Sequence, residues 1–218
     1  MNKFVYPVIH HLNAKLTLEQ ATICHQAGAD GVFLISHENK DNELPELGIE
    51  IKETLKMKVG LNLLATPAVQ SFDIVQKSKL DMLWLDNAGV SSEGLSPLGM
   101  LLKDLVNYKK LELFASVAFK YQKYESNPKE AAYLALKSGF IPVTSGSATG
   151  VSPAVEKIKE MSEAVGGNLG VASGMNLENI DNYKKYLKYI LVATGVSVDE
   201  HHFDYELLKA FIIKVKST

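Results

Sequence analysis

Short apolar runs and amphipathic stretches alternate along the whole chain. The apolar runs are nearly continuous, which is typical of strands whose two faces are both buried in a parallel sheet. They predict strands at 4–12, 30–36, 58–65, 80–86, 111–121, 140–145, 168–173 and 189–194. A helical pattern follows each strand, at 18–29, 44–55, 66–79, 97–108, 127–139, 152–165, from 176 onwards and at 205–216. Eight successive βα units predict an α/β protein with the fold of a single (β/α)8 TIM barrel around a parallel eight-stranded core, and a doubly wound open sheet is the alternative.

Capping residues predict where several helices begin. Thr17, with a glutamine three residues later, has the spacing of a capping box ahead of the first helix. Asn127 followed by Pro128 is typical of an N-cap and a first helical residue, and Ser152 with Pro153 repeats this pair. Small polar residues and prolines therefore mark the borders between predicted strands and helices.

Size and charge fit one barrel domain, which we expect to span residues 1–218. The 23 basic residues are all lysine and are opposed by 25 acidic residues, so the net charge is −2. This balance favours no nucleic-acid partner. Without arginine, the chain also lacks the guanidinium fork that binds phosphate or carboxylate through two parallel hydrogen bonds.

The chain shows no sign of export or membrane insertion. Cys24 is the only cysteine, so no internal disulfide can form, and its place in a predicted helix indicates a buried structural thiol. No apolar run approaches the ~18–20 residues of a membrane span, and the first one is too short for a signal peptide. We therefore expect a cytoplasmic protein without a membrane span.

Three turns of small residues follow the last three predicted strands, at 144–153, 172–175 and 193–197. Such turns direct free backbone N–H groups at an anion beside a helix N-terminus, and the loops after strands seven and eight of barrel enzymes often bind phosphate. The predicted phosphate-binding residues are Gly146, Ser147, Thr149, Ser173, Gly174, Met175, Thr194, Gly195 and Val196. The alternative is that these glycines and serines serve turn geometry alone.

Polar residues at the predicted strand ends are candidates for chemistry, because barrel enzymes place their active sites at that end. The candidate catalytic residues are Asp86, Lys120, His10 and Glu38. The candidate substrate wall consists of Asn62, Trp84 and Ser116. Period-two alternation places Trp84 and Asp86 on one face of their strand, and Ser116 and Lys120 on one face of the next.

Each candidate has a competing interpretation. Lys120 is suited to contact a phosphate, to act as an acid or to form a Schiff base, and it is otherwise a solvated lysine at the rim. Asp86 is the preferred general base, with capping of the turn at 87–89 as its rival role. Glu38 and the neighbouring His37 are a carboxylate and a titrating imidazole for the site, or residues of a surface loop.

The histidine pairs have separate interpretations. Alternation allows either His10 or His11 to face the barrel axis, and we favour His10 because Tyr6 and Val8 share its face. The adjacent pair at 201–202 lacks a cysteine or carboxylate at ligand spacing. We predict no metal and no cofactor.

The segment 140–197 resembles the BtpA/SgcQ-like family of the ribulose-phosphate-binding barrel superfamily. TSGSATGVSP at 144–153 is similar to the family's TG-x-x-TG segment, GVASGMNLENI at 170–180 to its GSG-V-x-x-ENV turn, and LVATGVSVDE at 191–200 to its IVGTS-L-K-x-DG ending. Weaker similarity covers HHL at 10–12, GLNLLAT at 60–66 and VAFKY at 117–121. The resemblance implies a barrel with a phosphate pocket.

Five positions depart from the family's pattern. The family carries arginine where this chain has Ala65 and Trp84, aspartate where it has Ser116, and histidine where it has Ala118 and Tyr121. Two functions follow as hypotheses. One is an enzyme that acts on a small phosphorylated metabolite by proton-transfer or lyase-type chemistry; the other is a barrel that binds a phosphate ligand or serves in assembly or regulation without catalysis. Assembly of the chain into a homo-oligomer is compatible with the sequence.

Overall fold

Eight parallel strands close into a barrel in the computed structural model, which describes residues 2–109 and 111–217. The strands are β1 (Phe4–His10), β2 (Gly31–Ile35), β3 (Lys58–Asn62), β4 (Met82–Leu85), β7 (Glu112–Ser116), β8 (Ile141–Thr144), β9 (Gly170–Ala172) and β10 (Tyr189–Val192). Their order around the barrel is β1-β10-β9-β8-β7-β4-β3-β2, and β1 pairs with both β2 and β10. The (β/α)8 prediction is confirmed, and the open sheet is excluded.

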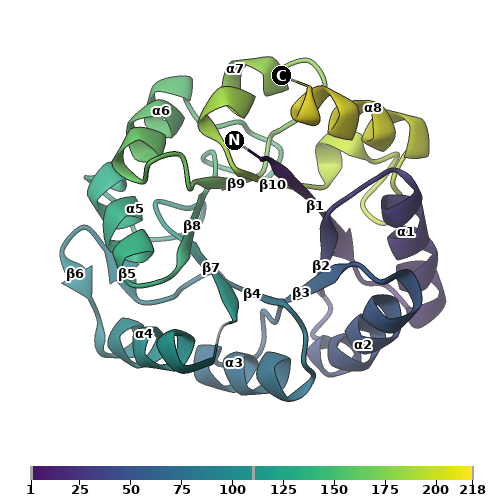
Figure 1. Ribbon diagram of the computed structural model, residues 1–218, viewed down its shortest axis with the longest axis horizontal. Helices are drawn as coiled ribbons and strands as arrows, with labels where there is room; N and C mark the ends of the chain where they lie inside the picture. The colour runs from purple at the N-terminus through teal and green to yellow at the C-terminus, as the bar shows by residue number, and fades with distance from the viewer. Residues whose placement is uncertain (1, 110, 218) are drawn as a thin grey trace.

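A ring of helices surrounds the strands, as Figure 1 shows in a view along the barrel axis. The α-helices are α1 (Ala14–Gln26), α2 (Leu44–Leu55), α3 (Ala68–Lys77), α4 (Pro97–Lys109), α5 (Pro128–Lys137), α6 (Val155–Ala164), α7 (Ile180–Tyr183) and α8 (Tyr205–Lys216). Short 3-10 helices are η1 (Asp41–Glu43), η2 (Lys184–Tyr186) and η3 (Thr194–Val196), and a small hairpin pairs β5 (Val90–Ser91) with β6 (Gly94–Leu95). Within the described residues, every helix is too short or too polar to cross a lipid bilayer.

Several helix starts differ from those predicted. Helix α1 begins at Ala14, because the side chain of Asn13 accepts a hydrogen bond from Leu16 N and so provides the cap; Thr17 lies inside the helix and is buried. Helix α6 begins at Val155, after the predicted Ser152–Pro153 cap. Helix α5 follows the prediction, since the Asn127 side chain accepts from Glu130 N and Pro128 is its first residue.

The predicted strand 111–121 is too long. Strand β7 ends at Ser116, and the chain then bends through two non-glycine residues with positive φ, Ala118 (47°) and Tyr121 (64°). The alternation that placed Lys120 on one strand face with Ser116 is therefore wrong, because Lys120 belongs to an irregular loop.

The inside of the barrel is packed with apolar side chains. They are Tyr6, Val8, Phe33, Ile35, Met82, Trp84, Phe114, Phe119, Val143, Ala172, Tyr189 and Leu191. Phe33 and Phe114 meet edge to face with their ring centroids 5.1 Å apart. Gly60 makes room for this packing, since a Cβ there would lie 2.3 Å from a ring carbon of Phe33. Among the described residues, these side chains fill the interior, and the main cavity lies at one end of the barrel.

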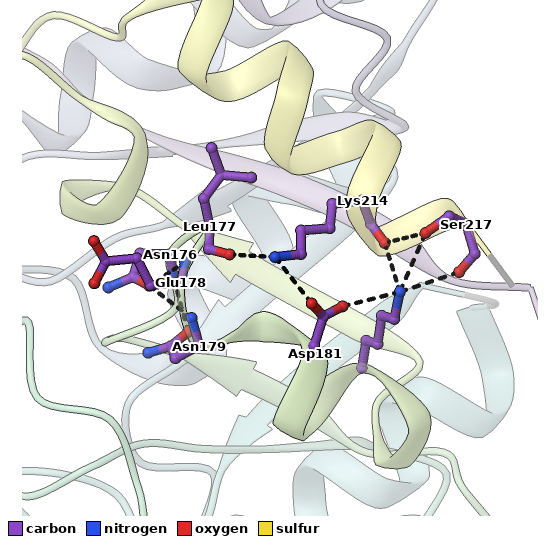
Figure 2. A network of polar contacts seen from close by, with 8 residues as sticks. Asn176, Leu177, Glu178, Asn179, Asp181, Lys214 and Ser217 are labelled. Atoms are coloured by element: carbon purple, nitrogen blue, oxygen red, sulfur yellow. Dashed lines mark hydrogen bonds and ion pairs between the residues drawn. The ribbon is translucent and has the colours of Figure 1, made fainter.

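Lysines join the last helix to the segment that follows β9, as Figure 2 shows. The Nζ atom of Lys214 on α8 donates to Leu177 O at 2.7 Å and lies 2.9 Å from a carboxylate oxygen of Asp181 on α7. Lys184 binds the other oxygen of Asp181 at 3.1 Å and donates to Lys214 O at 3.0 Å. This network joins α8 to the chain that leads away from the β9 turn.

Candidate functional site

A cavity opens at the C-terminal end of the barrel strands. Its volume is about 170 Å³, and it is open to solvent at its mouth. Its lining includes eleven predicted site residues: His10, Asn62, Trp84, Asp86, Lys120, Thr149, Ser173, Gly174, Met175, Thr194 and Gly195. The side chains of Val8, Ile35, Phe119 and Leu191 add an apolar surface.

A hydrogen bond and two ring contacts fix the position of the Trp84 side chain. Its indole Nε1 donates to Ser116 Oγ at 2.9 Å, and both residues are buried. The ring also packs edge to face against Phe33 and Phe119. Trp84 therefore lines the cavity in a fixed orientation, whereas Ser116, predicted as a wall residue, is not among the lining residues and has its hydroxyl engaged by Trp84.

The turns after β9 and β10 lie side by side at one edge of the cavity. Among the hydrogen bonds between described residues, none uses the backbone N–H groups of Gly174, Thr194 or Gly195, so these donors remain available to an anion. The N–H of Val196 is already occupied by Ala193 O at 2.9 Å, and Val196 is fully buried outside the lining.

The close packing of these turns also requires glycine at positions 174 and 195. A Cβ on Gly174 would lie 2.3 Å from Ser152 N, and one on Gly195 would lie 2.0 Å from Met175 O. Each glycine thus lets its turn pack directly against the backbone of the preceding loop. This close packing brings the successive small-residue turns together at one edge.

The loop after β8 contributes only in part. Thr149 Oγ1 accepts from Lys120 Nζ at 3.1 Å, and Gly150 N donates to Ser173 Oγ at 3.1 Å, which joins this loop to the β9 turn. Gly146 and Ser147 lie outside the main cavity and line a neighbouring depression instead. A Cβ on Gly146 would lie 2.1 Å from Val151 O, so this glycine serves the folding of the loop on itself.

Asp86 lies on the side of the barrel opposite the β9 and β10 turns, since β4 and β3 are separated from them by β7 and β8. Its Oδ1 accepts from Asn62 Nδ2 at 3.2 Å. The rival capping role belongs to Asn87, whose Oδ1 accepts from Gly89 N at 2.9 Å. The carboxylate of Asp86 therefore stays exposed at the mouth and oriented by a buried amide.

Lys120 is half-buried beside the rings of Phe119 and Tyr121. Burial lowers the pKa of its ammonium group, and the nearby Tyr121 and Asp86 partly oppose this effect. A lysine with a lowered pKa gives up its proton more readily than a solvated one. Its position against two aromatic rings follows from the bend after β7, which the strand pattern did not reveal.

The two adjacent histidines at the end of β1, of which His10 is the last strand residue, face opposite ways. His10 lines the cavity, and His11 points outward, where its Nδ1 and Nε2 contact Thr17 Oγ1 at 2.8 Å and Glu43 Oε2 at 3.1 Å. Burial, reinforced by the neighbouring His37, lowers the pKa of His10 to about 4. His10 is therefore neutral at physiological pH and keeps a free ring lone pair.

Glu38 does not reach the cavity. It is exposed, and its Oε2 lies 2.7 Å from Lys40 Nζ, which lowers the pKa of the carboxyl group. The neighbouring His37, which the sequence offered as a titrating imidazole for the site, does line the cavity. Phe119 and Tyr121 line it too, and sequence reasoning did not select these two as site residues. No periodic signal marks residues of irregular loops, so only their position in space identifies them.

The sequence matches no protein-family model and no curated protein. Solved structures do resemble the fold. Phosphoribosyl anthranilate isomerase from Thermus thermophilus has a TM-score of 0.69 at 16% identity, covering 97% of this chain and 98% of that one. Orotidine 5′-monophosphate decarboxylase from Methanocaldococcus jannaschii, complexed with the inhibitor BMP, has a TM-score of 0.71 at 13% identity and covers 100% of both chains.

A third similar structure is phosphoribosyl anthranilate isomerase in complex with reduced 1-(o-carboxyphenylamino)-1-deoxyribulose 5-phosphate. Its TM-score is 0.69 at 18% identity, with 99% of each chain covered. At such low identity the similarity extends to the fold of this chain, and activity is a separate question.

Proposed function

We propose that the cavity binds a small phosphorylated metabolite, sugar-phosphate or nucleotide-like, with the phosphate on the turns after β9 and β10. The observation that carries this proposal is the set of backbone N–H groups at Gly174, Thr194 and Gly195 that have no acceptor among the described residues and lie along one edge of the cavity. Backbone donors at such turns bind anions without a charged side chain. This suits a chain without arginine.

Groups for proton transfer lie around the rest of the cavity, with Asp86 opposite these turns, Lys120 after β7 and His10 at the end of β1, beside β10. We assign Asp86 as general base and Lys120 as general acid, with His10 as a neutral third group. The Asn62 side chain donates to the Asp86 carboxylate and orients it. The ring of Trp84 forms an apolar part of the cavity wall. A metabolite with its phosphate on the β9 and β10 turns would extend across the cavity towards these side chains, in a BtpA/SgcQ-like barrel.

A second candidate is a binding or regulatory barrel without catalysis. It is favoured by the replacement of polar family residues with Ala65 and Ala118, and by the engagement of Ser116 with Trp84. Both candidates require the same phosphate site, and they differ in whether Asp86 and Lys120 turn over a substrate.

A thermal-shift titration tests the phosphate site, with inorganic phosphate and ribose 5-phosphate as probes and ribose as the control. A ligand at 100 times its Kd is expected to stabilise the fold by about 2.7 kcal/mol. Stabilisation by the two phosphate compounds and not by ribose would support the proposal. Equal melting temperatures in all three titrations would contradict it.

Gly174→Ala and Gly150→Ala form a matched pair for the same experiment. Both glycines have positive φ, 73° and 78°, so alanine strains both backbones alike. Only at Gly174 does the new Cβ meet neighbouring backbone; at Gly150 it meets nothing within 4 Å. We expect the Gly174 variant to lose phosphate binding and the Gly150 variant to retain it. Equal affinities in the two would argue against a phosphate on the β9 turn.

Asp86→Asn and Lys120→Ala separate the enzyme from the binder once a phosphorylated ligand is found. An enzyme would lose turnover about 10²–10⁴-fold in each variant while keeping phosphate affinity. Full turnover in both variants would contradict the assigned acid and base, and a bound but unconverted ligand would favour the non-catalytic barrel.

A further inference from the structure

Two histidines and a glutamate meet at the rim of the barrel, beside the cavity. His10 ends β1, His37 follows β2, and Glu200 lies in the segment after β10. These three strands are neighbours in the barrel. One ligand atom from each side chain lies within 4.8 Å of the other two. The arrangement joins residues that are up to 190 positions apart in the sequence, so no sequence spacing indicates it.

His10 has an unexplained polar atom in this cluster. Its Nδ1 is buried and has no hydrogen-bond partner among the described residues. The Oε1 atom of Glu200 is 3.7 Å away, which is too long for a hydrogen bond. A buried ring nitrogen without a partner is unfavourable, and such atoms in native proteins usually have a reason, a missing ion or water among them.

The loop that carries Glu200 is tightly constrained. A β-bridge joins Ser197 to Phe203, and Val198 N donates to His202 O at 2.8 Å, so the loop closes on itself. Inside it, Asp199 Oδ1 accepts from His201 N at 2.9 Å. The ring of His201 then contacts His10 O at 3.0 Å through its Nδ1. The loop is therefore attached to the backbone of the very histidine that Glu200 faces.

We propose that one ring nitrogen each of His10 and His37 and a carboxylate oxygen of Glu200 bind a divalent transition-metal ion of the Zn²⁺ type. This revises the expectation that the chain holds no metal. Two imidazoles and one carboxylate are a ligand set that zinc and iron accept, whereas Mg²⁺ and Ca²⁺ prefer oxygen ligands alone.

The distances are close to those of a metal site. Ligands at 2.0–2.1 Å from a tetrahedral Zn²⁺ lie about 3.4 Å from one another. The observed 3.7 Å between His10 Nδ1 and Glu200 Oε1 is near this value. His37 and Glu200 are exposed, so their side chains can rotate to shorten the remaining separations.

Three protein ligands leave a fourth position free. His10 and His37 line both the main cavity and the adjoining depression at 197–200, so that position opens where a bound metabolite would have its oxygens. The metal would take a water or an oxygen of the ligand there. The site goes beyond the proposed phosphate turns, which lie on β9 and β10 and do not include these side chains.

Zinc titration of the untagged chain tests the site, after treatment with a chelator and without any phosphate compound. Isothermal titration calorimetry is expected to give one Zn²⁺ per chain. His37→Ala and Glu200→Gln should each weaken the affinity at least about tenfold, since each removes a ligand. His25→Ala is the control, because His25 is an exposed histidine on α1, away from the cluster. Cobalt substitution should add the visible absorption of four-coordinate Co²⁺ in the wild type and not in the two ligand variants.

Three results would each overturn the proposal. They are the absence of zinc binding by the wild type, a zinc affinity in both ligand variants as high as in the wild type, and a loss of zinc affinity in His25→Ala as large as in the ligand variants. Circular dichroism melting of the variants verifies the fold, and both ligand changes lie on exposed side chains. Phosphate binding is measured separately in the presence of chelator. If the protein binds phosphate but not zinc, or zinc but not phosphate, the result shows which of the two proposed sites is absent.

Discussion

Ser116 and Trp84 illustrate how a single residue gains its role from its neighbours. Sequence alternation placed Trp84 and Asp86 on one face of their strand, and both line the cavity, although β4 ends at Leu85 and Asp86 follows it. Ser116 shares the inner face of β7, yet the larger indole lies above it and uses its hydroxyl as an acceptor. Side-chain size, which alternation ignores, decides which inward residue reaches a ligand.

Ser116→Ala should destabilise the protein by about 1–3 kcal/mol, because the buried indole N–H of Trp84 would lose its acceptor. Urea denaturation followed by the fluorescence of Trp84, the only tryptophan, measures the change. Ser147→Ala is the control, since Ser147 is exposed in a loop and should leave the midpoint unchanged. Equal midpoints for the two variants would mean that this hydrogen bond contributes nothing.

Individual elements were predicted with uneven success. Helices α2 and α8 have the predicted bounds, because their apolar periodicity is regular and capping is local. Helix α7 is only Ile180–Tyr183, where a longer helix from Asn176 was expected. The side chain of Asn176 accepts from Glu178 N and Asn179 N, which produces a turn before the helix begins. An asparagine at such a position can therefore cap a helix or form a turn, and the packing of the surrounding chain decides which of the two occurs.

The segment between β7 and α5 depends on Glu125. Its Oε1 accepts from Ser92 Oγ at 2.6 Å and from Asn127 N at 2.9 Å, and its Oε2 accepts from Ser92 N at 3.0 Å. Burial alone would raise the pKa of Glu125, but these hydrogen bonds outweigh it and lower the pKa below its ordinary value of 4.5. The carboxylate thereby joins the β5–β6 hairpin to the start of α5.

Glu125→Gln should therefore reduce stability in a pH-dependent way. A carboxyl group whose folded pKa is lowered stabilises the fold above its unfolded pKa and loses that contribution as the pH falls through the folded pKa. The difference in unfolding free energy between wild type and variant should be largest near neutral pH and shrink as the pH falls below about 4.5. Urea unfolding at pH 7 and at lower pH measures it; a pH-independent difference would contradict the assigned role.

At the scale of the whole barrel, the packing of the interior links neighbouring strands. Gly60 lies on β3 against Phe33 of β2 and Met82 of β4, so its missing side chain is part of the packing across three strands. From the sequence alone, this glycine is an ordinary small residue within an apolar run. Its importance depends on ring positions that exist only after closure.

Gly60→Ala should lower stability by about 1–3 kcal/mol through overpacking. The added Cβ would lie 2.3 Å from a ring carbon of Phe33 and 2.9 Å from Met82 Cβ. Adding Phe33→Leu to the alanine variant should recover part of this loss, so the two changes should be less than additive in a double-mutant cycle. Strict additivity of the unfolding free energies would show that the two residues do not compete for this space.

The sequence by itself determined the barrel, the order of its elements and the three small-residue turns at one end. These features follow from period, run length and turn residues, all of which act over a few neighbouring positions. Only the tertiary structure decided that Ser116 supports Trp84, that Asn87 and not Asp86 caps its turn, and that His10, His37 and Glu200 meet. Those outcomes depend on strands that become neighbours when the barrel closes, and no local pattern records that proximity.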